Sequence, residues 1–241
     1  MGARHGSVRA ATLAACLVAA AATAETLPLP DKLISLDSDL GAQVFLDSTA
    51  RQAYWPLSIQ FVTQKNQAYC GVATLVMVLN ALGVRAPATP GIEPFTTFTK
   101  DNVLNERTER VLPQAVLLKK GMTLDQIGEL LETYAVASQV HHADRSSVEH
   151  FRTSASRHLG ARGRYVIVNY LRRSLGQELG GHISPLAAYD AISDRFLVLD
   201  VSRYKYPPVW VKTADIYAAM DTVDADNEGR HRGFVLIGTK P

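Results

Sequence analysis

The stretch that decides the fold is Gln64-Lys-Asn-Gln-Ala-Tyr-Cys70-Gly-Val-Ala-Thr-Leu-Val-Met-Val-Leu-Asn-Ala-Leu-Gly83, in which a polar lead-in gives way to an apolar run of helical length. A run that is apolar on every side is typical of a buried helix rather than of an amphipathic surface helix. Gly83 suits the left-handed position that often ends a helix. Cys70 would then lie at the helix N-terminus, where unpaired N–H groups favour a thiolate. Position alone fits a packing thiol as well as a reactive one.

Residues 1–24 have the layout of a secretory signal peptide. Arg4 and Arg9 precede an apolar run over residues 10–22, and Ala22-Thr-Ala24 forms an A-x-A cleavage site. The run is shorter than the ~20 residues that a spanning helix needs, so no stable membrane insertion is expected. We predict an exported protein, periplasmic or secreted, whose mature domain is 25–241, or 241 − 24 = 217 residues. Lipoprotein anchoring through Cys16 is the less favoured alternative, because little apolar sequence precedes this residue.

Cysteine usage and charge narrow the class of function. The chain has two cysteines, Cys16 and Cys70, so removal of the leader would leave one thiol and no internal disulfide. A lone cysteine in an exported chain indicates a reactive thiol or an intermolecular pairing. The net charge is +2 and the basic residues are scattered, so no nucleic-acid partner is expected. His141 and His142 lack the spacing of a metal site, so we predict a solvated pair and no metal ligands.

The hydrophobic period changes along the chain from helical to strand-like. Thr123 and Gln126 form a capping box before an amphipathic helix, and the pattern returns at Ser146–Glu149, with Gly160 as the end of that helix. The β-rich runs are 164–171, 183–189, 196–201 and 233–237, with a helix around 214–222 before the last run. Residues 25–56 and 84–95 show no sustained period. Helices followed by an antiparallel sheet indicate an α+β fold.

Two polar residues lie at the ends of predicted strands. His182 opens one strand beside Gly180 and Gly181, and Asp200 follows the apolar residues 196–199. An unpaired buried carboxylate is costly, and if the two strands form a hairpin, His182 and Asp200 come within hydrogen-bond reach. Each residue alone also fits a structural role. Together with Cys70 they give the order Cys, His, Asp of papain-like thiol enzymes.

Four segments carry a resemblance to phytochelatin synthases, which are similar to this chain from about Glu25 to its end. Phe61–Leu82 resembles the nucleophile segment of that family, and Gly181-His-Ile-Ser-Pro-Leu186 its histidine motif. Leu199-Asp-Val-Ser-Arg-Tyr-Lys-Tyr-Pro-Pro-Val-Trp210 resembles its long aspartate motif, and Arg232-Gly-Phe234 its closing strand. The chain most resembles the short bacterial members and shows no counterpart of the cysteine-rich C-terminal domain of the plant and yeast enzymes.

The resemblance implies a papain-like fold, glutathione as substrate and a role for each matched residue. Cys70, with its pKa lowered by the helix end and His182, would attack the Cys–Gly amide; His182 would act as acid and base; Asp200 would orient the imidazole. Gln64 would complete an oxyanion hole with the Cys70 N–H. The matched substrate residues are Asn169, Asp224 and Arg232 for the γ-glutamyl group, and Tyr69 and Arg203 near the second substrate.

Several outcomes stay open from the sequence. The γ-glutamylcysteinyl enzyme could be resolved by water, giving γ-Glu-Cys, or by a second glutathione, giving phytochelatin. No cofactor is expected, and Cd²⁺ or Zn²⁺ would enter as thiolate complexes of the substrate. A homodimer is a family-level expectation. The alternatives are a papain-like peptidase that cuts longer peptides and a non-enzymatic thiol- or metal-binding protein, which a single mature thiol disfavours.

Overall fold

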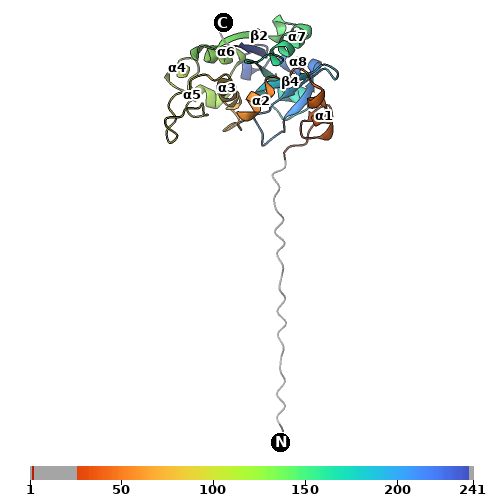
Figure 1. The fold of residues 1–241 in the computed structure, drawn as a ribbon, viewed down its shortest axis with the longest axis horizontal. Helices are drawn as coiled ribbons and strands as arrows, with labels where there is room; N and C mark the ends of the chain where they lie inside the picture. Colours follow the sequence, from red (N-terminus) through yellow and green to blue (C-terminus); the bar gives the residue numbers. More distant parts are fainter. Residues whose placement is uncertain (1, 3–25, 239–241) are drawn as a thin grey trace.

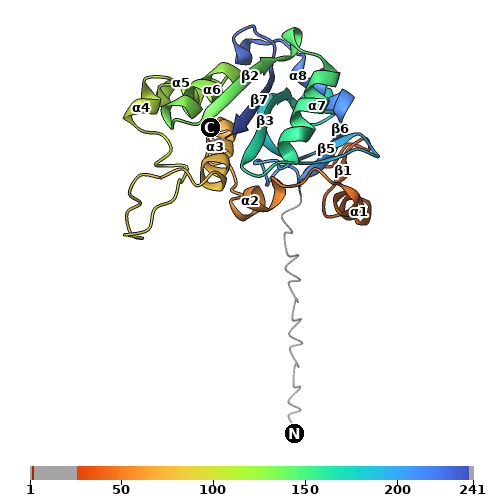
Figure 2. The same ribbon diagram turned by 45° about the horizontal axis from the view of Figure 1, so that its top comes forward.

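The computed structural model describes residue 2 and residues 26–238. The predicted signal peptide, its cleavage site and Cys16 lie outside these residues. Within them, none of the helices combines the length and apolar character that crossing a bilayer requires. The predicted antiparallel α+β architecture is confirmed, as Figures 1 and 2 show.

A seven-stranded sheet forms the centre of the described structure, in the order β1-β6-β5-β4-β3-β7-β2. Each strand pairs antiparallel with its neighbours. The strands are β1 (Ile34–Ser35), β2 (Ala137–His142), β3 (Arg164–Leu171), β4 (Gly181–Asp190), β5 (Arg195–Val198), β6 (Val209–Lys212) and β7 (Gly233–Gly238). The four β-rich runs of the sequence are β3, β4, β5 and β7, although β5 ends before Asp200. The sequence did not predict β1, β2 or β6.

Eight α-helices surround the sheet in the described structure. They are α1 (Asp39–Asp47), α2 (Tyr54–Ile59), α3 (Cys70–Ala81), α4 (Glu106–Glu109), α5 (Gln114–Lys120), α6 (Leu124–Thr133), α7 (Val148–Leu159) and α8 (Thr213–Met220). Three short 3-10 turns, η1 (Ala143–Arg145), η2 (Arg172–Leu175) and η3 (Ala225–Asn227), connect strands and helices. The capping box of Thr123 and Gln126 is confirmed at α6. The second cap was predicted one residue early, because Ser147 rather than Ser146 caps α7 through the N–H of His150.

Helix α3 is the buried helix that the sequence predicts. All residues from Cys70 to Leu79 are buried, and Gly83 takes the left-handed conformation, with φ of 67°, just past the helix end. Met122 and Ile183 approach Gly71 closely, since an added Cβ would lie 2.7 Å from the Met122 sulfur and would have to displace that side chain. Glycine after the cysteine therefore lets the helix end dock tightly on β4.

Helices α3 and α7 cover opposite faces of the sheet (Figure 2). Phe234 pairs with Val168 on one face and packs against Phe151 of α7, with the two rings tilted and their centroids 4.9 Å apart. Ile183 pairs with Asn169, one residue further along β3, and so projects to the other face, against α3. The sheet thus fixes the N-terminal end of α3 against the start of β4.

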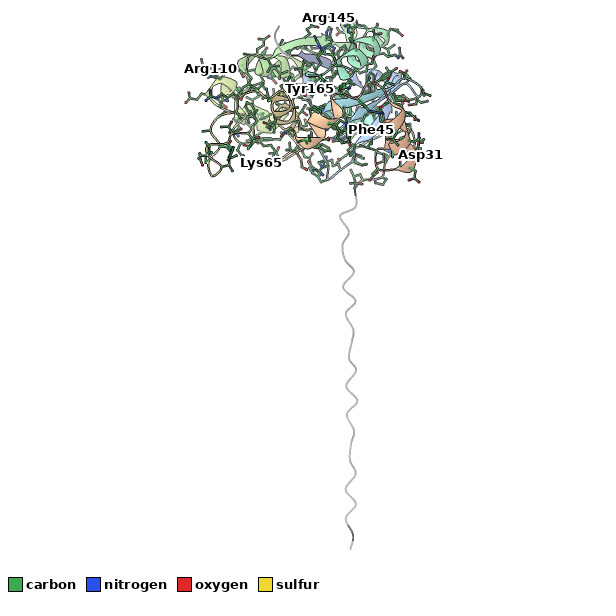
Figure 3. All side chains as sticks on the ribbon, in the orientation of Figure 1. Asp31, Phe45, Lys65, Arg110, Arg145 and Tyr165 are labelled. Atoms are coloured by element: carbon green, nitrogen blue, oxygen red, sulfur yellow. The ribbon has the colours of Figure 1, made fainter. Side chains whose placement is uncertain are left out.

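The far end of α3 is also tied to the sheet. Tyr165 of β3, labelled in Figure 3, is buried and donates its hydroxyl to the Ala81 carbonyl at 3.0 Å. This bond satisfies one of the carbonyls that a helix C-terminus leaves unpaired. Both ends of α3 are therefore held, and the helix forms a rigid support for Cys70.

Candidate active site

Cys70 is the first residue of α3 and lies in a buried position, with an exposed fraction of 6%. Burial raises the pKa of its thiol, and the backbone N–H groups of Ile183 and Gly71 and the charge of Arg172 oppose that rise without cancelling it. The expected lowered pKa of Cys70 is therefore wrong. The helix end acts in the predicted direction, but the loss of hydration outweighs it.

His182 and Asp200 meet as the predicted hairpin requires. Strands β4 and β5 pair antiparallel, and His182 Nε2 lies 2.9 Å from Asp200 Oδ1. Tyr170 presents its ring edge-on to the imidazole at a centroid distance of 5.6 Å and limits its movement. Burial and the charge of Arg172 lower the pKa of His182 to about 4, against the opposing effect of Asp200. Since Nε2 faces Asp200, Nδ1 is the nitrogen left to exchange protons in the pocket.

Arg172 holds the carboxylate of Asp200 and was not predicted from the sequence. Its Nη2 donates to Asp200 Oδ1 at 2.8 Å, and its Nη1 lies 2.8 Å from Oδ2. Arg172 also donates to Gln177 and stacks 5.2 Å from the centre of the Tyr206 ring. Burial favours the neutral acid, but His182 and Arg172 outweigh it and lower the pKa of Asp200. Asp200 is therefore an anion held between two partners.

Gln64 lies in the same pocket, with its amide oriented by neighbouring side chains. Ser202 donates its hydroxyl to Gln64 Oε1 at 2.7 Å, and Gln64 Nε2 donates to the Asn66 carbonyl at 2.8 Å and to the Tyr204 hydroxyl at 3.0 Å. The N–H of Ser202 also donates to Asp200 at 2.8 Å. One residue, Ser202, thus links the amide of Gln64 to the carboxylate of Asp200.

A pocket of about 320 Å³ joins these groups. Its walls include Gln64, Cys70 and His182 together with the segment Lys119–Met122. The charged side chains on the walls are mainly basic, namely Lys119, Lys120, Arg172, Lys205 and Arg232. Asp226 is the acidic residue among them. Such a field favours a small anionic ligand.

The predicted γ-glutamyl residues cluster at one part of this pocket. Asn169 and Arg232 line it, and Asn169 Nδ2 donates to Asn227 Oδ1 at 3.3 Å. Arg232 is buried, and its Nη2 donates to both carboxylate oxygens of Asp224 at 2.8 Å. Asp224 does not itself line the pocket but sets the position of Arg232, and Asn227 is a lining residue that the sequence did not indicate.

The structure does not bring the other two predicted substrate residues into this pocket. Tyr69 is buried and accepts a hydrogen bond at its hydroxyl from Gln114 of α5 at 3.0 Å. Arg203 is exposed and stacks over Phe61 at 4.8 Å. Tyr69 therefore ties α5 to the start of α3, while Arg203 lies on the surface over Phe61.

No cluster of three or more metal-ligating side chains occurs among residues 26–238 that could hold a metal ion. The predicted solvated histidine pair is wrong: His141 stacks on Phe234 at 4.8 Å, and both ring nitrogens of His142 are bound. Cys70 is the free cysteine of the described residues.

Comparison with known proteins identifies relatives that share most of this chain. The family model for phytochelatin synthase matches residues 24–234. Glutathione gamma-glutamylcysteinyltransferase 1 of Lotus japonicus is 33% identical over 214 residues, 88% of this chain and 41% of the relative. The enzyme of the same name in Arabidopsis thaliana is 32% identical over 88% of this chain and 43% of its own length. The glutathione gamma-glutamylcysteinyltransferase of Schizosaccharomyces pombe is 29% identical over 87% and 50%. The chain thus spans half or less of the length of these relatives.

Proposed function

Because the chain belongs to the phytochelatin synthase family, we propose that it transfers the γ-glutamylcysteinyl group of glutathione through a papain-like catalytic domain over residues 25–241. The proposal rests above all on one observation: Cys70 at the start of α3 shares a pocket with His182, which Asp200 holds at 2.9 Å. A thiol, an imidazole and an orienting carboxylate are the parts of a nucleophilic acyl-transfer site.

In the first half-reaction, Cys70 Sγ attacks the carbonyl carbon of the Cys–Gly amide of glutathione. His182 accepts the thiol proton at Nδ1 as the C–S bond forms, because burial keeps Cys70 protonated and His182 neutral before substrate arrives. Collapse of the tetrahedral intermediate breaks the C–N bond, and His182 returns the proton to the glycine amine. The products are free glycine and a γ-glutamylcysteinyl thioester on Cys70.

The tetrahedral oxyanion is stabilised by Gln64 Nε2 and the Cys70 N–H. Ser202 binds the amide oxygen of Gln64, so the donor end of the amide is directed away from Ser202. This donor reaches the Asn66 carbonyl and the Tyr204 hydroxyl, and the latter belongs to an exposed side chain that the oxyanion can replace as acceptor. Removing one such donor typically costs about 10²–10³ in rate.

Charge complementarity supports glutathione over a longer neutral peptide. The γ-glutamyl carboxylate is matched by Arg232, whose guanidinium is held in position by both carboxylate oxygens of Asp224. The basic walls suit the glycyl carboxylate at the other end of the substrate. The pocket volume of about 320 Å³ is at the small end for ligand sites, in keeping with a tripeptide.

In the second half-reaction, His182 activates either water or the amine of another glutathione. Water gives γ-Glu-Cys, and glutathione gives a phytochelatin with a new peptide bond. Cd²⁺ or Zn²⁺ would take part as a thiolate complex of the substrate. We further propose that the chain acts after export, with Cys70 as its single mature thiol.

Product analysis with glutathione tests this function. The full chain, with and without Cd²⁺ or Zn²⁺, should release glycine together with γ-Glu-Cys or longer oligomers, and the ratio reveals which nucleophile completes the reaction. Cys70→Ser and His182→Ala should abolish glycine release with the fold intact by circular dichroism, whereas Cys16→Ser is the matched thiol control and should remain active. Cleavage of longer peptides without glutathione turnover would support a general peptidase instead. Metal retention without any turnover would support a binding protein.

A further inference from the structure

The segment 224–232 carries the γ-glutamyl end of the pocket, and it is irregular except for η3 and a single β-bridge from His231 to Val223. It contains Asp224, Asn227 and Arg232. Asn227 closes the segment on itself: its side-chain Nδ2 donates to the Arg230 carbonyl at 2.8 Å, and its backbone N–H donates to Asp224 Oδ1 at 3.1 Å. Irregular segments of this kind need an anchor in the fold if their side chains are to keep a fixed position.

His142, the last residue of β2, supplies such an anchor from outside the catalytic pocket. Its Nδ1 lies 2.7 Å from the His231 carbonyl oxygen, and its Nε2 lies 2.8 Å from Asp125 Oδ1 in the first turn of α6. The ring thus joins the backbone of segment 224–232 to a separate helix. Next to it, the Ala143 N–H donates to the Arg232 carbonyl at 2.9 Å. Two consecutive residues therefore fix the end of the segment that bears Arg232.

The partners of His142 define its protonation in this arrangement. A backbone carbonyl only accepts hydrogen bonds, so Nδ1 must carry a proton. Asp125 is an ionised acceptor as well: burial opposes ionisation, but His142 and Arg230 outweigh it and lower the pKa of Asp125. Nε2 must then carry a proton too. His142 makes both bonds only as an imidazolium, and as a neutral ring it loses one of them.

Other charged groups, both acidic and basic, surround the ring and its two partners. Arg230 pairs with the remaining carboxylate oxygen of Asp125, and His231 turns its ring to Asp221 at 2.6 Å. A separate groove of about 700 Å³ beside His142 is lined from α6, β2, η1 and the segment 224–232. The charged groups of that groove are Asp125, Glu129, Glu132, Asp144, Arg145, Arg230 and His231.

We propose that His142 is a positioning residue for substrate binding: as an imidazolium it bridges α6 to segment 224–232 and so holds Arg232, Asp224 and Asn227 in place for the γ-glutamyl group. This inference rests on the proposed function. His142 does not line the catalytic pocket, so it should affect the affinity for glutathione and not the chemical step at Cys70. Glutathione binding should therefore depend on the proton that His142 carries.

His142→Gln tests the proposal, with His158→Gln as the matched control. His158 is a half-buried histidine on α7 whose Nδ1 contacts the Ser154 carbonyl at 3.0 Å, far along the chain from segment 224–232. At about pH 6, where histidine can be protonated, His142→Gln should raise the KM for glutathione about tenfold, a change equivalent to about 1.4 kcal/mol. Its kcat should stay within about twofold of wild type, and alkylation of Cys70 by iodoacetamide should keep its rate, since the chemistry is unchanged.

The dependence on pH separates positioning from a general structural effect. Deprotonation of the ring at high pH removes one of its two N–H donors, so the KM ratio of His142→Gln to wild type should shrink toward one as the pH is raised from about 6 to about 9. The ionisation of glutathione itself affects both proteins and cancels in this ratio. An unchanged KM in His142→Gln at about pH 6, a ratio that does not vary with pH, or a parallel loss of kcat and alkylation rate would each overturn the proposal.

Hydrogen exchange distinguishes a failure of this proposal from a failure of the proposed function. If the wild-type chain releases no glycine from glutathione, the proposed function fails. The role of His142 as an anchor is then tested by the hydrogen-exchange rates of the backbone amides of residues 225–232. These amides should exchange about tenfold faster in His142→Gln than in wild type at about pH 6. Equal exchange rates would refute the anchor itself, whatever the substrate.

Discussion

Replacing Asp200 with asparagine removes one charge from a buried cluster while nearly preserving the side-chain shape. In the native protein, Asp200 Oδ1 accepts from Arg172 at 2.8 Å, and the Arg172 side chain is only 3% exposed. The variant leaves that guanidinium buried without a counter-charge. Breaking a buried pair in this way costs about 3–5 kcal/mol. For a domain of this size, each kcal/mol corresponds to about 2–4 °C, so Asp200→Asn should melt about 6–20 °C below wild type.

The double variant Asp200→Asn with Arg172→Met separates stability from catalysis. Replacing both members of a buried pair by groups that need no counter-charge is often neutral, so the double variant should recover most of the lost melting temperature. Glycine release should stay about 10²–10⁴-fold below wild type in both variants, because neither holds His182 against a carboxylate.

Calorimetry and a glycine-release assay on the same samples measure the two effects. Asp190→Asn is the matched control: Asp190 is also buried, but it accepts from the backbone and hydroxyl of Ser193 and has no buried arginine partner. It should lose less stability than Asp200→Asn and keep its activity. A wild-type melting temperature in Asp200→Asn, or a double variant as unstable as the single one, would refute the role assigned to the Arg172–Asp200 pair. Full activity in Asp200→Asn would refute the role assigned to the carboxylate.

Three further outcomes follow from named contacts. The pKa of His182 is about 4 in the folded protein and about 6.5 when unfolded, so the unfolded state binds more protons between these values. The free energy of unfolding should therefore fall by up to about 3 kcal/mol as the pH is lowered through this window. In urea unfolding, His182→Asn should lack this part of the dependence of stability on pH, and an unchanged dependence would contradict the shift. Gly181→Ala places a Cβ 2.8 Å from Arg232 Nη2 and should raise the KM for glutathione about tenfold. Gly238→Ala is the control, because its Cβ would lie 3.5 Å from the nearest atom, Arg164 Nη1, and its KM should not change; equal KM values in the two variants would exclude crowding of Arg232. Ser202→Ala removes the hydroxyl that binds Gln64 Oε1 but keeps the backbone N–H bond of residue 202 to Asp200. The kcat should therefore fall about tenfold without a comparable rise in KM. An unchanged kcat would show that the Gln64 amide does not need the Ser202 hydroxyl to orient it.

The sequence predicts those elements of the fold whose residues are buried along their whole length. Helix α3 is apolar throughout because it is buried throughout, and β3 is predicted from Arg164 to Leu171 because every residue but the first is buried. Strand β2 was missed because its six residues are only half-buried or exposed and include two histidines. Its place in the sheet comes from pairing with β7, a contact between segments about a hundred residues apart that no local pattern encodes.

The residues of the site likewise fall into those that the sequence predicts and those that it does not. Cys70 begins α3, His182 lies at the start of β4 and Asp200 follows shortly after β5, so the pattern of elements predicts that they converge. Arg172 follows β3 in a 3-10 turn, and its role depends on reaching Asp200, 28 residues away, which no spacing rule indicates. The pKa of Cys70 was predicted in the wrong direction because the sequence reveals the helix end but not the extent of burial. Tyr69 and Arg203 came from resemblance alone, and the structure places neither on the pocket wall.

The most direct test of the account is the mass of the intact protein after rapid quenching with glutathione. The proposed chemistry predicts a γ-glutamylcysteinyl adduct that maps to Cys70, forms together with one equivalent of glycine, and is lost on treatment with hydroxylamine, as expected for a thioester. His182→Ala should fail to form it. Glycine release without any adduct on Cys70, or an adduct retained in Cys70→Ala, would contradict the assignment of Cys70 as the nucleophile.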